Sequence, residues 1–169
     1  DGGVLEVDNV IVAPGGTLAG DASVVGRVSV ATGGVIAPGD GTAGSIGTLS
    51  VTGDVDFSPA VGGFGLLEID IDGLLSDMLS VSGNLDLSGA TLDLNFIGPP
   101  TGMAYLIADY GTLTGTFGTV VDLPAGWHVD YTFGGMNRIA VVPEPSAIVL
   151  AGLGVAGIAA WRLRRKRPA

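Results

Sequence analysis

The stretch LSVTGDVDF at residues 49–57 recurs as LSVSGNLDL at residues 79–87, an offset of 30. In both copies apolar residues alternate with small or polar residues, and a glycine stands in the middle. A period of two is typical of a β-strand with one buried face, and a glycine inside such a strand indicates a bend. The recurrence therefore predicts strands that stack on each other in successive copies of one unit.

A second, shorter repeat lies nearer the start of the chain. VAPGGTLA at residues 12–19 recurs as VATGGVIA at residues 30–37, an offset of 18. Repeats of this length with turns between short strands predict a solenoid in which each coil buries its apolar face on the next. The unequal offsets indicate coils that differ by insertions in their loops.

Alternating apolar residues continue through most of the chain, and glycine-rich turn signals separate them. No convincing helical period precedes residue 143, so residues 1–142 are predicted to be all-β. A right-handed parallel β-helix is the leading architecture, and an antiparallel β-sandwich is the alternative, because alternation and turns serve both folds. Residues 127–133 and 138–142 are expected to form a hairpin that caps an open sheet edge. The alternating positions are Val28, Val30, Leu49, Val51, Leu67, Ile69, Ile71, Leu79, Val81, Leu85, Leu87, Leu92, Leu94 and Phe96.

The carboxyl end has a different character. After Pro143-Glu144-Pro145, an apolar and glycine-rich run spans residues 147–161, and a basic segment follows it. The two prolines predict an extended, exposed motif. As a helix the 15-residue run would be about 22 Å long, which is short for a bilayer and also fits a buried core helix. The adjoining positive charge favours a transmembrane helix with a cytoplasmic basic end. The basic stop consists of Arg162, Arg164, Arg165, Lys166 and Arg167.

Together the proline-glutamate-proline motif, the apolar run and the basic stop resemble the PEP-CTERM sorting tail. This resemblance implies that an exosortase reads Pro143, Glu144 and Pro145, and that processing nearby detaches the tail. It further implies an exported surface protein of an exopolysaccharide-producing Gram-negative cell, with a link to biofilm. Less specifically, residues 10–120 resemble the β-helical stem of autotransporter passenger domains, a resemblance carried by segments 37–51 and 76–83.

These features divide the chain into four predicted parts: an exported β-solenoid (1–142), a sorting-motif linker (143–146), a transmembrane helix (147–161) and a basic cytoplasmic tail (162–169). The protein is expected in the inner membrane during transit, with its body outside the cytoplasm. It is then expected at the cell surface or in the extracellular matrix. Because the chain starts at Asp1 with no leader, residue 1 is expected to be an internal position of a longer or trimmed precursor.

Composition limits the classes of partner and metal site that the chain can have. Without residues 162–169, 17 acidic residues stand against Arg27 and Arg138, a formal charge of −15. Such a surface repels polyanions, so nucleic acid is excluded as a partner. The chain has no cysteine, which excludes disulfides and thiolate metal sites.

Carboxylates are the main candidates for chemistry. Glu68, Asp70 and Asp72 alternate with apolar residues and are expected on one face of one strand. A glycosidase needs two opposed carboxylates, whereas the solvated face of a strand gives the same pattern without any activity, so no enzyme and no catalytic residue is predicted. No cofactor is expected. Calcium is the one cation considered, at Asp40 or at Asp54 with Asp56, although the spacing of known calcium loops is missing.

His128 lacks a sequence-assignable partner for zinc or catalysis and is expected to be a partly exposed strand residue. The aromatic side chains of the second half would either form a sugar-stacking patch or belong to the core, and the core is favoured. The leading function is an exported structural or adhesion protein of the surface or matrix. The alternative is a β-helix that binds or degrades polysaccharide. The aromatic residues are Tyr105, Tyr110, Trp127, Tyr131 and Phe133.

Overall fold

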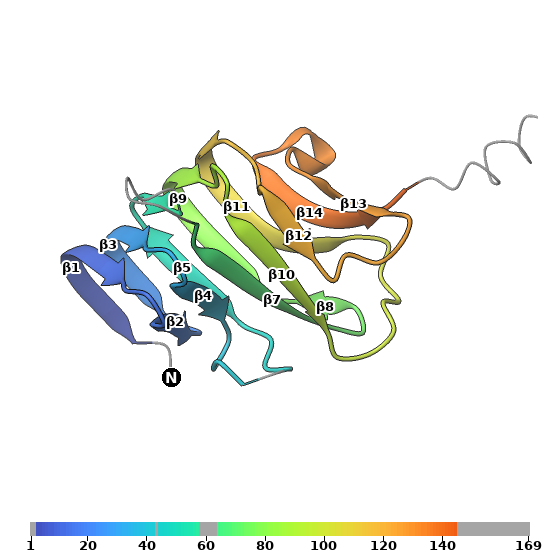
Figure 1. Cartoon of the computed structure of the whole chain (residues 1–169), viewed down its shortest axis with the longest axis horizontal. Helices are drawn as coiled ribbons and strands as arrows, with labels where there is room; N and C mark the ends of the chain where they lie inside the picture. Colours follow the sequence, from blue (N-terminus) through green and yellow to red (C-terminus); the bar gives the residue numbers. More distant parts are fainter. Residues whose placement is uncertain (1–2, 43, 58–63, 145–169) are drawn as a thin grey trace, which may run out of the picture.

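The computed structural model of the chain describes residues 3–42, 44–57 and 64–144. The described part is all-β, apart from one short 3-10 turn, and it forms a β-solenoid (Figure 1). An eight-stranded sheet has the order β1-β3-β5-β9-β11-β14-β13, with the short β6 paired to β3 and β9. Its strands are β1 (Val4–Val12), β3 (Ser23–Val30), β5 (Thr48–Thr52), β6 (Val55–Asp56), β9 (Met78–Asp86), β11 (Tyr105–Thr114), β13 (Trp127–Asp130) and β14 (Arg138–Pro143).

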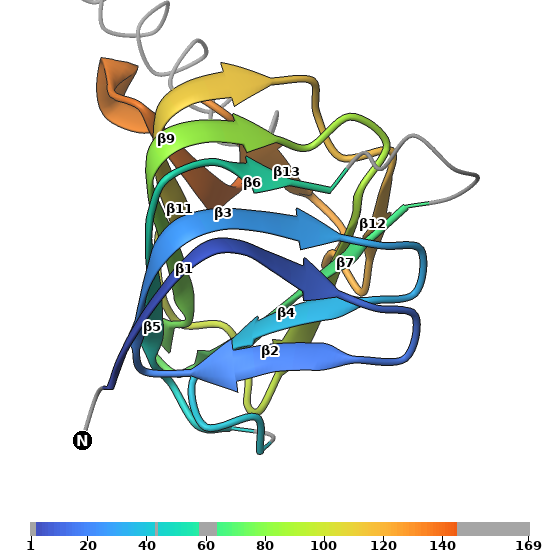
Figure 2. The same cartoon turned by 90° about the vertical axis from the view of Figure 1, so that its left-hand side faces the viewer.

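A second sheet of six strands faces the first, in the order β12-β10-β7-β4-β2, with β8 paired to β7. Successive segments alternate between the two sheets, so the chain winds as a flattened coil (Figure 2). The strands are β2 (Thr17–Gly20), β4 (Val35–Pro38), β7 (Leu66–Asp72), β8 (Leu75–Ser76), β10 (Thr91–Phe96) and β12 (Thr119–Val121), and the turn η1 is Phe133–Gly135.

Parallel pairing decides between the two predicted folds. From β1 to β11 the neighbouring strands of the first sheet are parallel, as are β2, β4, β7, β10 and β12 in the second. Parallel neighbours need a crossover between them, which the opposite sheet supplies. The solenoid prediction is therefore confirmed, and the antiparallel sandwich is not the fold.

The strand register has the same offsets as the sequence repeats. Leu49 lies opposite Leu79, and Val55 lies opposite Leu85, an offset of 30 in both pairs. Val12 pairs with Val30 at the shorter offset of 18. Each repeated residue therefore stacks on its own copy in the next coil, so the pattern that identifies the fold also builds its core.

The core lies between the two sheets. Every alternating apolar position predicted from the sequence is buried except Phe96, which is partly buried against the same cluster. Phe57, Ile107 and Val141 are also fully buried there. Apolar burial at about 25 cal/mol per Å² is the main favourable term in a chain without disulfides.

Glycine marks the bend between strand segments. Gly53 has a φ of 149°, a value that L side chains rarely adopt. Gly83 stacks on it through a backbone hydrogen bond of 2.9 Å from its amide to the carbonyl oxygen of Gly53. A Cβ atom on Gly83 would collide with that carbonyl oxygen. The backbones of adjacent coils therefore approach closely at this corner.

The predicted terminal hairpin is present. Strands β13 and β14 pair antiparallel, and β14 also pairs antiparallel with β11. The hairpin thus covers the last edge of the parallel sheet, as expected. Among the described residues, no helix has the length and apolar character that a bilayer crossing requires. The predicted transmembrane helix at 147–161 and the basic stop at 162–169 lie outside the described residues.

Candidate functional site

The sorting motif begins inside the last strand. Pro143 ends β14 and lies opposite Trp127 of β13. The amide of Glu144 then donates a hydrogen bond of 2.7 Å to the carbonyl oxygen of Gly126. Both motif residues are exposed. The extended, exposed segment predicted from the prolines is therefore seen at Pro143 and Glu144, whereas Pro145 lies outside the described residues.

Aromatic packing fixes the strand that leads to the motif. The ring of Trp127 stacks on Tyr105, with centroids 5.7 Å apart and planes 22° apart. The rings of Phe96 and Tyr105 form a T-shaped pair, with centroids 6.4 Å apart and planes 79° apart. The hydroxyl of Tyr105 donates to the carbonyl oxygen of Gly73 at 2.8 Å and accepts from the amide of Gly102 at 2.7 Å. The end of β14 is thereby tied to loops from two other coils.

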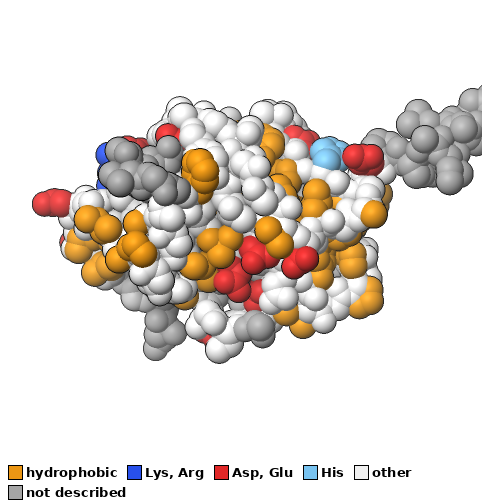
Figure 3. Space-filling view, in the orientation of Figure 1, with side chains coloured by type: hydrophobic (Ala, Val, Ile, Leu, Met, Phe, Trp, Pro, Cys, Tyr) orange, Lys and Arg blue, Asp and Glu red, His pale blue; other side chains and the backbone are white. Residues whose placement is uncertain are grey.

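Acidic side chains gather over β7 and β10 (Figure 3). Asp70 is 6% exposed and Asp77 is 2% exposed. Asp77 accepts from the amide of Gly47 at 2.8 Å and from that of Asp70 at 2.9 Å. Asp70 accepts from the amide of Gly44 and from the side-chain amide of Asn95. These two carboxylates therefore hold the loop between β4 and β5 against β7.

The environment of this cluster disfavours negative charge. Burial, with a smaller effect from the charges of Asp70 and Glu68, raises the pKa of Asp77 to about 6, although two backbone hydrogen bonds act in the opposite direction. Burial, with the nearby charges of Asp70 and Asp93, also raises the pKa of Glu68. Because these pKa values are raised, the carboxyl groups of Asp77 and Glu68 bind protons more readily in the folded chain than in the unfolded chain.

Only part of the predicted carboxylate row is solvated. Asp72 is exposed and Glu68 is partly buried, but Asp70 is buried, because the 39–47 loop covers this part of the strand. The expectation of a uniformly solvated face is therefore wrong at Asp70. Asp77 was missed by sequence reasoning, because one of its two partners, Gly47, lies in a loop 30 residues earlier and no periodic signal marks the position.

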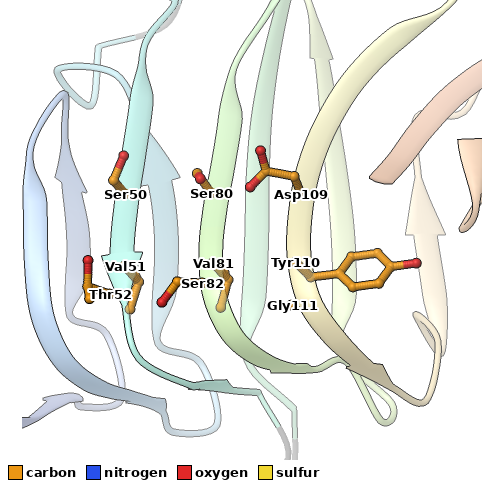
Figure 4. A pocket seen from close by; sticks show the side chains of 9 residues that line it. All are labelled: Ser50, Val51, Thr52, Ser80, Val81, Ser82, Asp109, Tyr110 and Gly111. Carbon is orange, nitrogen blue, oxygen red and sulfur yellow. The ribbon is translucent and has the colours of Figure 1, made fainter. Parts of the chain in front are cut away.

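A second polar surface lies across the first sheet. A shallow groove of about 380 Å³ is lined by residues of β5, β9 and β11. Ser50, Ser80 and Asp109 lie in one row there, because Ser80 pairs with both of the others (Figure 4). Thr52 and Ser82 follow two positions further along their strands. The groove thus offers hydroxyl groups and one carboxylate from three successive coils.

The calcium candidates have protein partners. Asp40 is exposed and accepts hydrogen bonds from the amide and hydroxyl of Thr42, which lower its pKa. Asp54 accepts from the amide of Asn84 at 2.8 Å, and Asp56 forms an ion pair of 2.8 Å with Arg27. Within residues 3–42, 44–57 and 64–144, no three His, Cys, Asp or Glu side chains are grouped as a metal site.

For His128 and the aromatic residues, the sequence favoured ordinary strand or core positions over a binding site. His128 is exposed on β13. Tyr105 and Tyr110 are buried in the core, and Trp127 and Tyr131 pack against it. Phe133 is partly buried in η1. These aromatic residues do not form an exposed stacking patch for sugars.

Comparison with known proteins gives one match. The PEP-CTERM protein-sorting motif matches residues 141–166, which include Pro143, Glu144 and Pro145 together with the apolar run and most of the basic stop. No curated protein and no solved structure is significantly similar to the chain. The match begins at Val141, inside β14, so the end of the last strand belongs both to the body and to the signal. The chain is therefore a β-solenoid that ends in a PEP-CTERM sorting motif, the signal of an exported exosortase substrate.

Proposed function

We propose that this chain is a structural or adhesion protein of the cell surface or extracellular matrix, associated with exopolysaccharide and biofilm after an exosortase has processed its tail. The observation that carries the proposal is the direct junction between the last strand and the sorting motif. A signal that begins within the sheet leaves no further domain between the body and the site of processing. The solenoid is then the part of the cargo that directly adjoins the signal.

The topology that we propose has the β-solenoid at 1–142 outside the cytoplasm, the motif linker at 143–146, a transmembrane helix at 147–161 and a cytoplasmic basic tail at 162–169. A tail of this order suits insertion with its positive end inside. Pro143, Glu144 and Pro145 would be read by the exosortase, and Arg162, Arg164, Arg165, Lys166 and Arg167 would stop transfer.

A structural role fits the side chains of the body. The two buried carboxylates, Asp70 and Asp77, accept hydrogen bonds from backbone amides of the same loop. Their oxygens therefore hold this loop against β7. Glycosidases instead direct two carboxyl groups at a substrate from opposite sides. We therefore propose that the protein has no enzymatic activity.

The direct test expresses the chain in its exporting host with and without the exosortase and measures the mass of the product. Loss of residues 162–169 only when the exosortase is present is the expected result. Glu144→Gln should slow this processing, whereas Glu6→Gln, which removes another exposed carboxylate, on β1, should not. Retention of the basic stop in both hosts would refute the proposal.

A second candidate function is polysaccharide binding, which the hydroxyl groove favours. Its polar groups repeat once per coil along the row of Ser50, Ser80 and Asp109, as an extended polyhydroxyl chain would require. Calorimetric titration with purified exopolysaccharide of the host tests this function. Binding that Ser80→Val weakens would support it, and absence of binding would leave the structural role alone.

A further inference from the structure

Four apolar side chains are exposed in two neighbouring connections that hydrogen bonds join at Gly73. Leu74 and Leu75 are 72% and 63% exposed, and Ile97 and Met103 are 44% and 87% exposed. We call these four residues the apolar rim. Leu74 lies in the turn after β7 and Leu75 begins β8, whereas Ile97 and Met103 belong to the connection from β10 to β11.

Hydrogen bonds hold the two loops of the apolar rim together. The carbonyl oxygen of Gly73 accepts from the hydroxyl of Thr101 at 2.9 Å and from the hydroxyl of Tyr105 at 2.8 Å. The amide of Ile97 donates to the carbonyl oxygen of Ile71 at 2.9 Å. These bonds fix the backbone that carries the rim. Hydrophobic side chains are visible on the side of the molecule where β8 lies (Figure 3).

Gly73, at which the two connections of the rim are joined, is linked through two aromatic rings to the place where the chain leaves the body. Tyr105, which binds Gly73, stacks on Trp127, and Trp127 lies opposite Pro143. After Glu144 only Pro145 and Ser146 precede the apolar run that starts at Ala147. Three residue steps of at most about 3.6 Å each allow Glu144 and Ala147 to lie no more than about 11 Å apart.

We propose that the apolar rim rests on the lipid surface while the tail anchors the chain, with its side chains at the boundary between headgroups and acyl chains. This inference depends on the membrane anchor of the proposed function. A short tether holds this end of the body near the bilayer, and interfacial burial removes apolar surface from water. Because the body is strongly acidic, the lipid surface that it fits is zwitterionic rather than anionic.

The opposite end of the first sheet provides a matched control. Ile11 on β1 is 69% exposed, so it resembles the rim residues in chemistry and accessibility. However, β1 is the first strand of the sheet order, and β14, which carries the exit, is next to last. A lipid contact set by the tether therefore protects the rim and leaves Ile11 in water.

Spin labels on the full chain in phosphatidylcholine vesicles test the inference. The chain has no cysteine, so Leu74→Cys, Met103→Cys and Ile11→Cys each give one labelled site. Collisions with a water-soluble nickel complex should be several-fold rarer at positions 74 and 103 than at position 11. In a second experiment, Leu74→Asp with Met103→Asp should raise nickel access to a label on Ile97→Cys, because the two charges oppose burial of the rim in lipid.

The outcomes separate the inference from the function on which it rests. Equal nickel access at all three sites in a chain that sediments with the vesicles would overturn the lipid contact and leave the anchor intact. A chain that stays in the supernatant would overturn both. Protection of the rim that appears only after an exosortase is added would assign this surface to a protein partner and would also overturn the lipid contact.

Discussion

Asp70 and Asp77 bind each other through two hydrogen bonds in opposite directions. The amide of Asp70 donates to a carboxylate oxygen of Asp77 at 2.9 Å, and the amide of Asp77 donates to the carbonyl oxygen of Asp70 at 2.9 Å. The other carboxylate oxygen of Asp77 accepts from Gly47. One buried side chain therefore closes the turn around β8 and also holds the 39–47 loop.

Stability is predicted to increase as the pH falls into the window set by Asp77. The pKa of Asp77 is about 6 in the folded chain, against 3.8 for the ordinary side chain. Between these values the folded state binds more protons than the unfolded state, so the free energy of unfolding falls as the pH rises from about 4 to about 6. Urea unfolding at several pH values measures this trend. Asp77→Asn should flatten it, whereas Asp8→Asn, at an exposed site, should not.

Replacing Gly83 by alanine is predicted to destabilise the corner of the solenoid. The new Cβ would collide with the carbonyl oxygen of Gly53 and the side chain of Asp54, so the coils must separate locally. Overpacking of this kind costs about 1–3 kcal/mol, measurable as a lower urea midpoint. Gly98→Ala is the control, because nothing lies within 4 Å of its Cβ position. Equal midpoints for the two variants would contradict the close stacking.

Removing the hydroxyl of Tyr105 is predicted to loosen the loops around Gly73. Tyr105→Phe keeps the ring on Trp127 but leaves the carbonyl oxygen of Gly73 and the amide of Gly102 without this partner. Because Tyr105 is 1% exposed, the loss should be about 1–3 kcal/mol by denaturant unfolding. Thr101→Val removes an exposed hydrogen bond to the same carbonyl and should cost less. The reverse order would contradict this account.

The ion pair between Arg27 and Asp56 is predicted to contribute little. Its atoms are 2.8 Å apart, but the side chain of Arg27 is 54% exposed. Exposed pairs are worth about 0.2–1 kcal/mol, so a double-mutant cycle with Arg27→Met and Asp56→Asn should give a coupling energy in that range. Added salt should reduce it further. A coupling well above that range would indicate that the pair is shielded from solvent.

Local pattern was enough to predict the body of the fold but not its polar contacts. The pairs Leu49 with Leu79 and Val12 with Val30 could be found by aligning the chain with itself, because stacked coils need similar residues at the same position. Asp77 could not be found in this way, since its function comes from the loop that folds over it. Asp70 was misjudged for the same reason: alternation indicates the side of a strand but not what covers that side.

The sequence by itself determined the all-β class, the repeat offsets, the terminal hairpin and the sorting motif at residues 141–166, because each depends on a local order of residue types. Only the tertiary structure decided that the strands pair in parallel as a solenoid, that Pro143 is part of the last strand and that two buried carboxylates hold one loop. These relations join residues from different coils. Their geometry depends on loop paths and burial, which period and composition do not specify.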